Sequence, residues 1–364
     1  MKTTKQSIAL LLGLGASILI ISCAKSGGSP KTGSGSGATV STFAGSGVSG
    51  ATNGSGTAAS FSFPASVILG ANNEIYVGDF GNSLVRTINL NSTAVATFAG
   101  TGVQGLLNGP AATAEFNGTA NIVFDGSGDL FVADEENNVI REITAAGNVV
   151  TVAGNGTLGY QDGPAASAEF NYPEGIVLDA NGNLYVADGH NNVIRKINLS
   201  TGTVSTFAGN GSVGFDNGAL TSATFDDPYG LAFDASGNLY VADVQNNCIR
   251  KITISTGMVS TFAGSGNQGL TNGPTASATF NYPLACIFDS DNNMYISDTY
   301  NNVIRKVSAA GNVTTFAGAG SSGLTNGAAA SATFNFPIGL LVNGDGIYVA
   351  DTHNNVIRKI TVGQ

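Results

Sequence analysis

The sequence predicts an all-β protein, a six-bladed β-propeller of four-stranded antiparallel blades. The first observation is a sixfold repeat of about 55 residues, the signature of a repeat architecture. Its first marker is a YVAD-like sequence followed after two residues by NNVIRKI, and its second is TFAG or TVAG. The aspartates of the first marker are Asp79, Asp134, Asp188, Asp243, Asp298 and Asp351.

The order of the markers at the two ends of the chain is the second observation. TVSTFAG (39–45) is a fourth-strand sequence with no partners before it, whereas NVIRKITVG (355–363) is a third-strand sequence with no fourth strand after it. The two ends complete each other. We therefore expect the N-terminal strand to complete the last blade, which closes the ring and removes exposed sheet edges.

Each unit divides into four short runs bounded by turn residues. In the third unit, FNYPEGIVLDANG (170–182) predicts a strand and a turn, followed by strands at 183–188, 193–199 and 203–209. Alternating apolar residues between Asn-Gly and Thr-Gly turns are typical of antiparallel hairpins. The composition agrees, with 51 glycines, no tryptophan and 10% charged residues in 364. Four strands per unit, six times over, fit propeller blades around a channel.

These residues resemble the NHL-repeat family of β-propellers. The resemblance is carried by Pro173, Gly175 and Ile176 at the entry to the unit, by LYVAD and by NNVIRKI, and it covers about residues 39–364. It implies the propeller fold. It is not specific for function, because this fold hosts sensors, binding modules and a few enzymes.

Several repeated residues are interpreted as scaffold. All six arginines occupy one position, seven residues after the blade aspartate, where an Asp–Arg bond across a hairpin is expected. The Asn-Asn pairs and the DANGN-like sequences are interpreted as turns, the latter in preference to calcium loops. We expect the long connections between units, with their recurring Ala and Phe, to pack between blades. Cys248 and Cys286 are interpreted as buried apolar residues in preference to a disulfide.

The N-terminus predicts export and a lipid anchor. Lys2 and Lys5 precede an apolar run that ends directly before Cys23, a signal-peptide pattern too short to span a bilayer comfortably. The sequence IISC (20–23) resembles a bacterial lipobox, which implies that Cys23 is lipidated and becomes the new N-terminus. The predicted organisation is a lipoprotein signal peptide (1–22), a flexible Gly/Ser-rich tether (23–38) and the propeller (39–364).

Charge limits the range of partners. The net charge is −10, and the first 22 residues carry two lysines and no acid, so the remainder stands at −12. No basic patch is available for nucleic acid. We expect a monomer in the bacterial cell envelope, on the outer membrane or the periplasmic or surface side, held to the membrane through its lipid.

The candidate site lies at positions where the six units differ. These are the two residues after each blade aspartate and the residue after the proline position, on the propeller face that generally carries ligands. The chain's only two histidines lie at the same position in units three and six, on opposite sides of the ring. The candidate rim residues are Phe80, Glu135, Glu136, Glu174, His190, Tyr229, Gln245, Tyr300 and His353.

A binding module for a glycan, peptide or protein ligand is the leading hypothesis, because aromatic and amide side chains suit such ligands. The alternative is a metal-dependent propeller enzyme of lyase or lactonase type. Two histidines and the lack of a recognisable catalytic triad argue against the enzyme, so we assign no catalytic or metal-ligating residue. No cofactor is expected, with calcium or zinc in the channel as the alternative.

Overall fold

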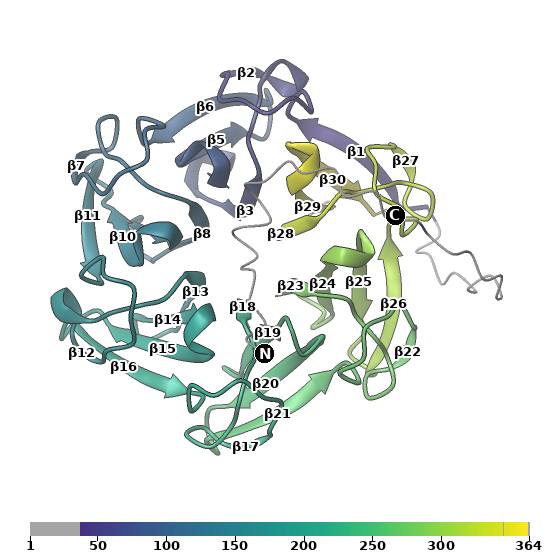
Figure 1. The fold of residues 1–364 in the computed structure, drawn as a ribbon. Coiled ribbons are helices and arrows are strands. Elements are labelled where there is room, and N and C mark those ends of the chain that lie inside the picture. Colours follow the sequence, from purple (N-terminus) through teal and green to yellow (C-terminus); the bar gives the residue numbers. More distant parts are fainter. Residues whose placement is uncertain (1–36, 345, 363–364) are drawn as a thin grey trace, which may run out of the picture.

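The computed structural model describes residues 37–344 and 346–362, which form a closed ring of six blades (Figure 1). The predicted six-bladed propeller is therefore confirmed. The predicted signal peptide, Cys23 and nearly all of the predicted tether lie outside the described residues. None of the described helices is long and apolar enough to cross a membrane.

The first three blades follow the chain in order. Blade 1 contains β2 (Gly54–Ser55), β3 (Pro64–Leu69), β4 (Glu74–Asp79), β5 (Leu84–Asn89) and β6 (Ala94–Ala99). Blade 2 contains β7 (Gly109–Pro110), β8 (Thr119–Phe124), β9 (Leu130–Asp134), β10 (Val139–Ile143) and β11 (Asn148–Ala153). Blade 3 contains β12 (Gly163–Pro164), β13 (Pro173–Leu178), β14 (Asn183–Asp188), β15 (Val193–Asn198) and β16 (Thr203–Ala208).

The other three blades repeat this plan, and the last one uses both ends of the chain. Blade 4 contains β17 (Gly218–Ala219), β18 (Pro228–Phe233), β19 (Leu239–Asp243), β20 (Cys248–Thr253) and β21 (Met258–Ala263). Blade 5 contains β22 (Gly273–Pro274), β23 (Pro283–Phe288), β24 (Met294–Asp298), β25 (Val303–Val307) and β26 (Asn312–Ala317). Blade 6 contains β27 (Gly327–Ala328), β28 (Pro337–Asn343), β29 (Gly346–Asp351), β30 (Val356–Thr361) and β1 (Thr39–Ala44).

Helical structure in the described chain is confined to single 3₁₀ turns. Five of them follow the second main strand of a blade: η3 (Phe80–Asn82), η4 (Glu135–Asn137), η6 (Gly189–Asn191), η7 (Thr299–Asn301) and η8 (Thr352–Asn354). The others are η1 (Gly56–Ala58), η2 (Ala71–Asn73) and η5 (Ala165–Ser167).

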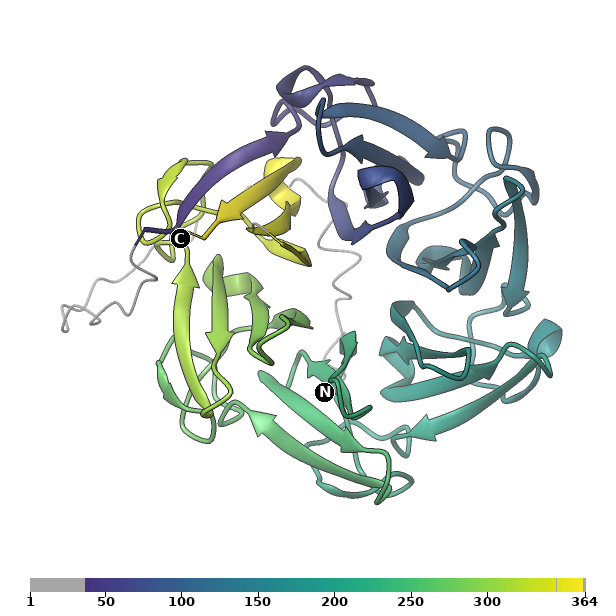
Figure 2. The ribbon, with the colours of Figure 1, turned by 180° about the vertical axis from the view of Figure 1, so that it is seen from behind.

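The ring closes as the order of the markers predicts. β1 pairs antiparallel with β30, with Val40 opposite Ile360, and the purple and yellow strands lie side by side in Figures 1 and 2. Val40 and Ile360 are buried. The first strand of the ring thereby covers the edge that the last strand would otherwise expose.

Each blade has five strands in the structure, one more than the four expected. The additional strand is a two-residue segment of the interblade connection that pairs with the outermost long strand, as Gly163 does with Val204. The connection therefore lies along the outer edge of the blade. Its alanine and phenylalanine are buried between blades, as expected; Ala168 and Phe170 are 0% exposed.

An Asp–Arg pair lies at the centre of every blade. In blade 5, Arg305 Nη1 donates to Asp298 Oδ2 over 2.6 Å, and its Nη2 donates to Thr271 O and Asn272 Oδ1 in the preceding connection. Neither charged side chain is exposed. Burial raises the pKa of Asp298 to about 6, against the opposing effects of Arg305 and the amide donors. The expected pairing is present in all six blades.

The remaining scaffold predictions are also confirmed. Asp179 Oδ1 accepts hydrogen bonds from the backbone N–H groups of Asn181 and Asn183, so this sequence forms the expected turn. Cys248 and Cys286 are buried free thiols. The six innermost strands surround a channel of about 290 Å³, with mostly apolar lining that includes Ile122 and Ile176.

Replacing Arg305 with methionine is expected to lower the free energy of unfolding by about 3–5 kcal/mol, because it leaves the Asp298 carboxylate buried without its cation. Urea unfolding measures the loss. The matched control is Lys306→Met on the same strand, where the side chain is partly exposed and a change below about 1 kcal/mol is expected. Equal losses in the two variants would contradict a central role for the pair.

Candidate functional site

The candidate site lies at the end of the blades where the innermost strands begin, and we call this end the mouth; the residues that line the 290 Å³ channel, such as Ile122 and Ile176, lie further along the same strands. The second strand of each blade ends at its aspartate, and the innermost strand begins opposite that aspartate, as Pro173 does opposite Asp188. The turn after the aspartate and the entry to the innermost strand therefore lie at the same end. The variable positions singled out in the sequence belong to these two segments.

The residue that precedes each innermost strand has an unusual backbone. Five of the six are bulky or charged residues in the left-handed region, a conformation that costs about 1–3 kcal/mol for a side chain larger than glycine and that clusters at functional sites. They are Phe63, Tyr172, Asp227, Tyr282 and Phe336, with φ between 48° and 58°, and Gly118 takes the same place in blade 2 with φ 78°.

The second asparagine of the preceding blade holds this conformation. Asn192 is itself left-handed (φ 56°), and its Oδ1 accepts the backbone N–H of Asp227 over 3.1 Å. The same bond joins Asn138 to Tyr172, Asn247 to Tyr282, Asn302 to Phe336 and Asn355 to Phe63. The asparagines predicted as turn formers therefore also aim the mouth residues of the next blade.

Aromatic rings line the mouth over blades 5, 6 and 1. The centroids of Tyr282 and Tyr300 are 4.5 Å apart, and Tyr300 meets Phe336 edge-on at 5.1 Å. Phe336 stacks on His353 at 4.3 Å with the planes 6° apart, and His353 meets Phe63 at 5.6 Å. We call this set (Phe63, Tyr282, Tyr300, Phe336 and His353) the aromatic arc.

Carboxylates gather over blades 2, 3 and 4. Glu135, Glu174 and Asp227 are 2%, 1% and 7% exposed. Burial is the main cause that raises the pKa of Glu135 and Glu174 well above the usual range, and the charge of Asp227 adds to both shifts. Tyr229, from the same region, is buried as well, and its pKa is raised by burial and by the three carboxylates. We call Glu135, Glu174 and Asp227 the acidic arc.

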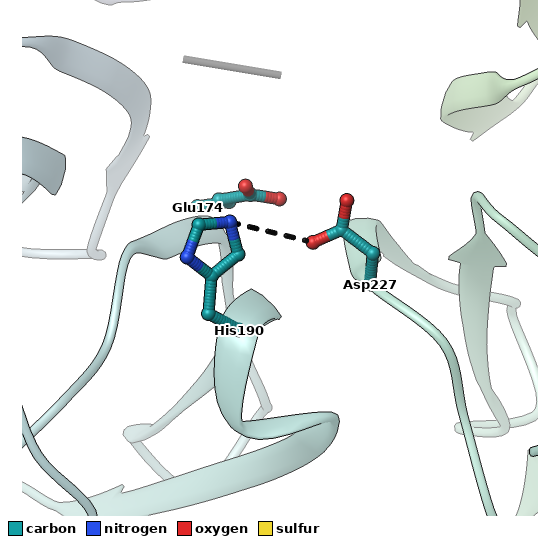
Figure 3. A group of neighbouring side chains, drawn as sticks. All are labelled: Glu174, His190 and Asp227. Atoms are coloured by element: carbon teal, nitrogen blue, oxygen red, sulfur yellow. Dashed lines mark ion pairs between the residues drawn. The ribbon is translucent and has the colours of Figure 1, made fainter. Parts of the chain in front are cut away.

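His190 lies against the acidic arc. Its Nε2 is 4.0 Å from Asp227 Oδ1, and its ring lies 4.4 Å from that of Tyr172. One ligand atom each from Glu174, His190 and Asp227 can be chosen so that all three lie within 4.8 Å of one another. Figure 3 shows His190 rising from the turn after β14 toward Asp227, with the Glu174 carboxylate beside both.

Gly175 explains how two blades bring these groups so close. A Cβ atom at this position would collide with the carbonyl oxygen of Tyr229. Glycine therefore permits the innermost strands of blades 3 and 4 to touch directly beside Glu174. As a consequence, Glu174 and Tyr229, which stand beside this contact, lie close together at the mouth.

The structure divides the nine predicted rim residues into two groups by their burial. Phe80, Glu135, Glu174 and Tyr229 are buried within the mouth, whereas the other five are only partly buried: Glu136, His190, Gln245, Tyr300 and His353. Gln245 Oε1 accepts a 2.7 Å hydrogen bond from the hydroxyl of Tyr282. The two histidines have different neighbours, since His353 joins the aromatic arc and His190 contacts Tyr172 and Asp227.

The sequence interpretation missed the residue before each proline position. It compared the residue that follows this position, but Tyr172, Asp227 and Tyr282 precede it. The signal was available, because this residue also changes from unit to unit between repeated neighbours. The contacts of these side chains across blades could not be read from one unit.

Comparisons with known proteins agree with the fold. The NHL repeat family model matches residues 170–197 and 225–252. The chain is 28% identical over 321 residues to the chloroplast protein SUPPRESSOR OF QUENCHING 1 of Arabidopsis thaliana, covering 83% of this chain and 30% of that protein. It is 30% identical over 317 residues to NHL repeat-containing protein 2 of Homo sapiens, covering 82% of this chain and 39% of that protein. The chain thus spans about a third of these relatives' length.

Among solved structures, a protein from Bacteroides ovatus described as an auxiliary nutrient binding protein superimposes with a TM-score of 0.69. The sequence identity is 18%, and the match covers 90% of this chain and 77% of that chain. At this identity the likeness concerns the fold alone. Together with the repeat matches, it agrees with the propeller that the sequence predicts.

Replacing Glu135 with glutamine is expected to stabilise the chelator-treated protein at pH 7. The pKa of Glu135 is raised above its unfolded value near 4.5, so the folded state loses stability as the pH rises from about 4.5 toward the folded pKa, and the loss is constant above it. The gain should be about 1 kcal/mol or more at pH 7 and smaller at pH 4.5. Thermal melting measures it, with Glu115→Gln in an interblade connection as the control. A loss of stability at pH 7 would contradict the argument.

Proposed function

We propose that this chain, a six-bladed propeller of NHL repeats, is a lipid-anchored binding module of the bacterial cell envelope whose ligand is a glycan at the channel mouth. The observation that carries the proposal is the division of the mouth into an aromatic arc and an acidic arc. Every blade keeps the same Asp–Arg pair and the same positive φ before its innermost strand. The propeller itself therefore does not require different side chains at the mouth of each blade.

The chemistry of the two arcs suits a sugar. The aromatic arc offers partly buried ring surface, on which the C–H face of a pyranose can pack. Carboxylates and the Gln245 amide are strong hydrogen-bond acceptors and donors for hydroxyl groups. A protein ligand would have to insert a narrow loop, because most of these groups are partly or fully buried. The nutrient-binding description of the Bacteroides ovatus neighbour is consistent with a small ligand.

The anchor rests on the sequence of residues 1–23. A basic start, an apolar run and a cysteine in a lipobox-like context are the features of an exported lipoprotein. A Gly/Ser-rich tether of the predicted length would let the propeller stand off the membrane. The binding face would then be accessible to soluble or surface glycans.

The alternative function, a metal-dependent enzyme of lyase or lactonase type, is favoured by one observation. Glu174, His190 and Asp227 form a group that could hold a metal ion. A cleavable substrate would also need a base or acid beside the metal. Release of product from a glycan or lactone panel, abolished by His190→Ala, would support the enzyme over the binding module.

Replacing Tyr300 with alanine is expected to weaken glycan binding about tenfold, because it removes part of the ring surface of the aromatic arc. A glycan array identifies the ligand, and calorimetry with that ligand compares the variants. The control is Tyr160→Ala, which removes an exposed aromatic ring from an interblade connection. Retention on peptide or protein arrays alone, or equal affinity of the two variants, would overturn the glycan assignment.

Replacing Cys23 with serine is expected to move the protein from the membrane fraction to the soluble fraction of cells. Acyl chains on the cysteine would be lost, and a bare tether has no membrane affinity of its own. Cell fractionation with metabolic labelling by a palmitate analogue measures both the anchor and the lipid. Cys248→Ser, which changes a buried cysteine of the propeller, should leave the labelling intact. An unchanged membrane fraction in the Cys23 variant would exclude this anchor.

A further inference from the structure

Three side chains of types that ligate metals converge at the mouth from two neighbouring blades. Glu174 stands at the start of β13, His190 in the turn η6, and Asp227 directly before β18 (Figure 3). We propose that Glu174, His190 and Asp227 bind one divalent zinc ion. This site would exist whether or not the mouth also binds a glycan, and it does not depend on the proposed function.

The distances fit a single ion. Zinc lies about 2.0–2.2 Å from carboxylate oxygen and histidine nitrogen in a tetrahedral arrangement, so two ligand atoms of one ion stand about 3.4 Å apart. His190 Nε2 and Asp227 Oδ1 are 4.0 Å apart, and one ligand atom from each of the three residues lies within 4.8 Å of the others. The ligand atoms would have to approach one another by about 1 Å, which rotation of the three side chains can supply.

The carboxylate of Glu174 points independently to a ligand. Its residue is 1% exposed, and within residues 37–344 and 346–362 its Oε2 has no hydrogen-bond partner. An ionised oxygen buried without a partner is costly. A bound cation would supply the missing interaction.

The charges around the site also favour a cation. Glu135 is buried in the same arc, and its charge acts on Glu174. The six arginines cannot neutralise the negative charge of the acidic arc, because each is paired with the aspartate of its own blade. A concentration of carboxylates with few nearby cations raises the local affinity for metal ions.

The ligand types select zinc over calcium. Calcium takes six to eight oxygen ligands, whereas one imidazole and two carboxylates match the mixed nitrogen and oxygen ligands of zinc. Three protein ligands leave a fourth position for water or for an oxygen of a bound molecule.

The test is calorimetric titration of zinc chloride into the full-length, chelator-treated protein, purified without a histidine tag. We expect one zinc ion per chain, with affinity at least about 100-fold lower in His190→Ala and in Glu174→Gln. His353→Ala is the matched control, because it removes the other histidine of the same repeat position. Asp291→Asn, an exposed acid in the turn between β23 and β24, controls for the lost charge. Both controls should bind zinc like the unchanged protein.

Three results would overturn the site. They are no binding at one ion per chain, equal binding in all four variants, and tight binding of calcium but not zinc. Zinc-edge X-ray absorption of the loaded protein should show one imidazole among oxygen ligands, and an all-oxygen shell would contradict the role of His190. Glu174→Gln keeps the size of the side chain, so its circular dichroism spectrum should match that of the parent and separate lost binding from lost fold.

Discussion

The buried Asp–Arg pair is the interaction on which the other features of this propeller depend. A guanidinium inside a blade carries several donors, and the two terminal nitrogens of Arg305 donate to Asp298 and to Thr271, Asn272 and Thr279 of the interblade connection. One side chain therefore ties two strands of the blade to the loop that leads into it. Since the pair costs desolvation energy, its value lies in positioning as much as in stability. The same geometry is repeated in six blades.

This positioning extends to the mouth through the residues beside the pair. The first asparagine of the pair, which is the last residue of the turn, donates to the blade aspartate, as Asn191 does to Asp188. The second asparagine adopts the left-handed region and accepts the N–H of the mouth residue of the next blade. This hydrogen bond from the backbone N–H fixes the position of the mouth residue's Cα. The side chain of that residue can therefore differ from blade to blade. This separation allows Tyr172 and Asp227 to occupy equivalent positions.

The scaffold could be predicted from the repeat in the sequence, whereas the contacts at the mouth depend on how neighbouring blades meet in the closed ring. The spacing of Asp188 and Arg195 implies a hairpin contact, and the end strands imply closure, because both follow from local periodicity. Glu174, His190 and Tyr229 were singled out because their positions vary. Asp227 was overlooked, although it lies 4.0 Å from His190, because its neighbour belongs to another blade. The fifth strand was also missed, since a two-residue pairing such as Gly163 with Val204 leaves no periodic signal.

The differences between the blades at the mouth are better explained by the chemistry of a ligand than by the requirements of folding. Position 65 in blade 1 is alanine and the equivalent position 174 in blade 3 is glutamate, yet both are buried on the same strand entry. An apolar residue there avoids the desolvation of a charge, as Leu284 and Ile338 show in blades 5 and 6. Glutamate at this position therefore lowers the stability of the unliganded propeller. The rigid blades can tolerate that cost, and a cation or a hydrogen-bonding ligand is the chemistry that would offset it.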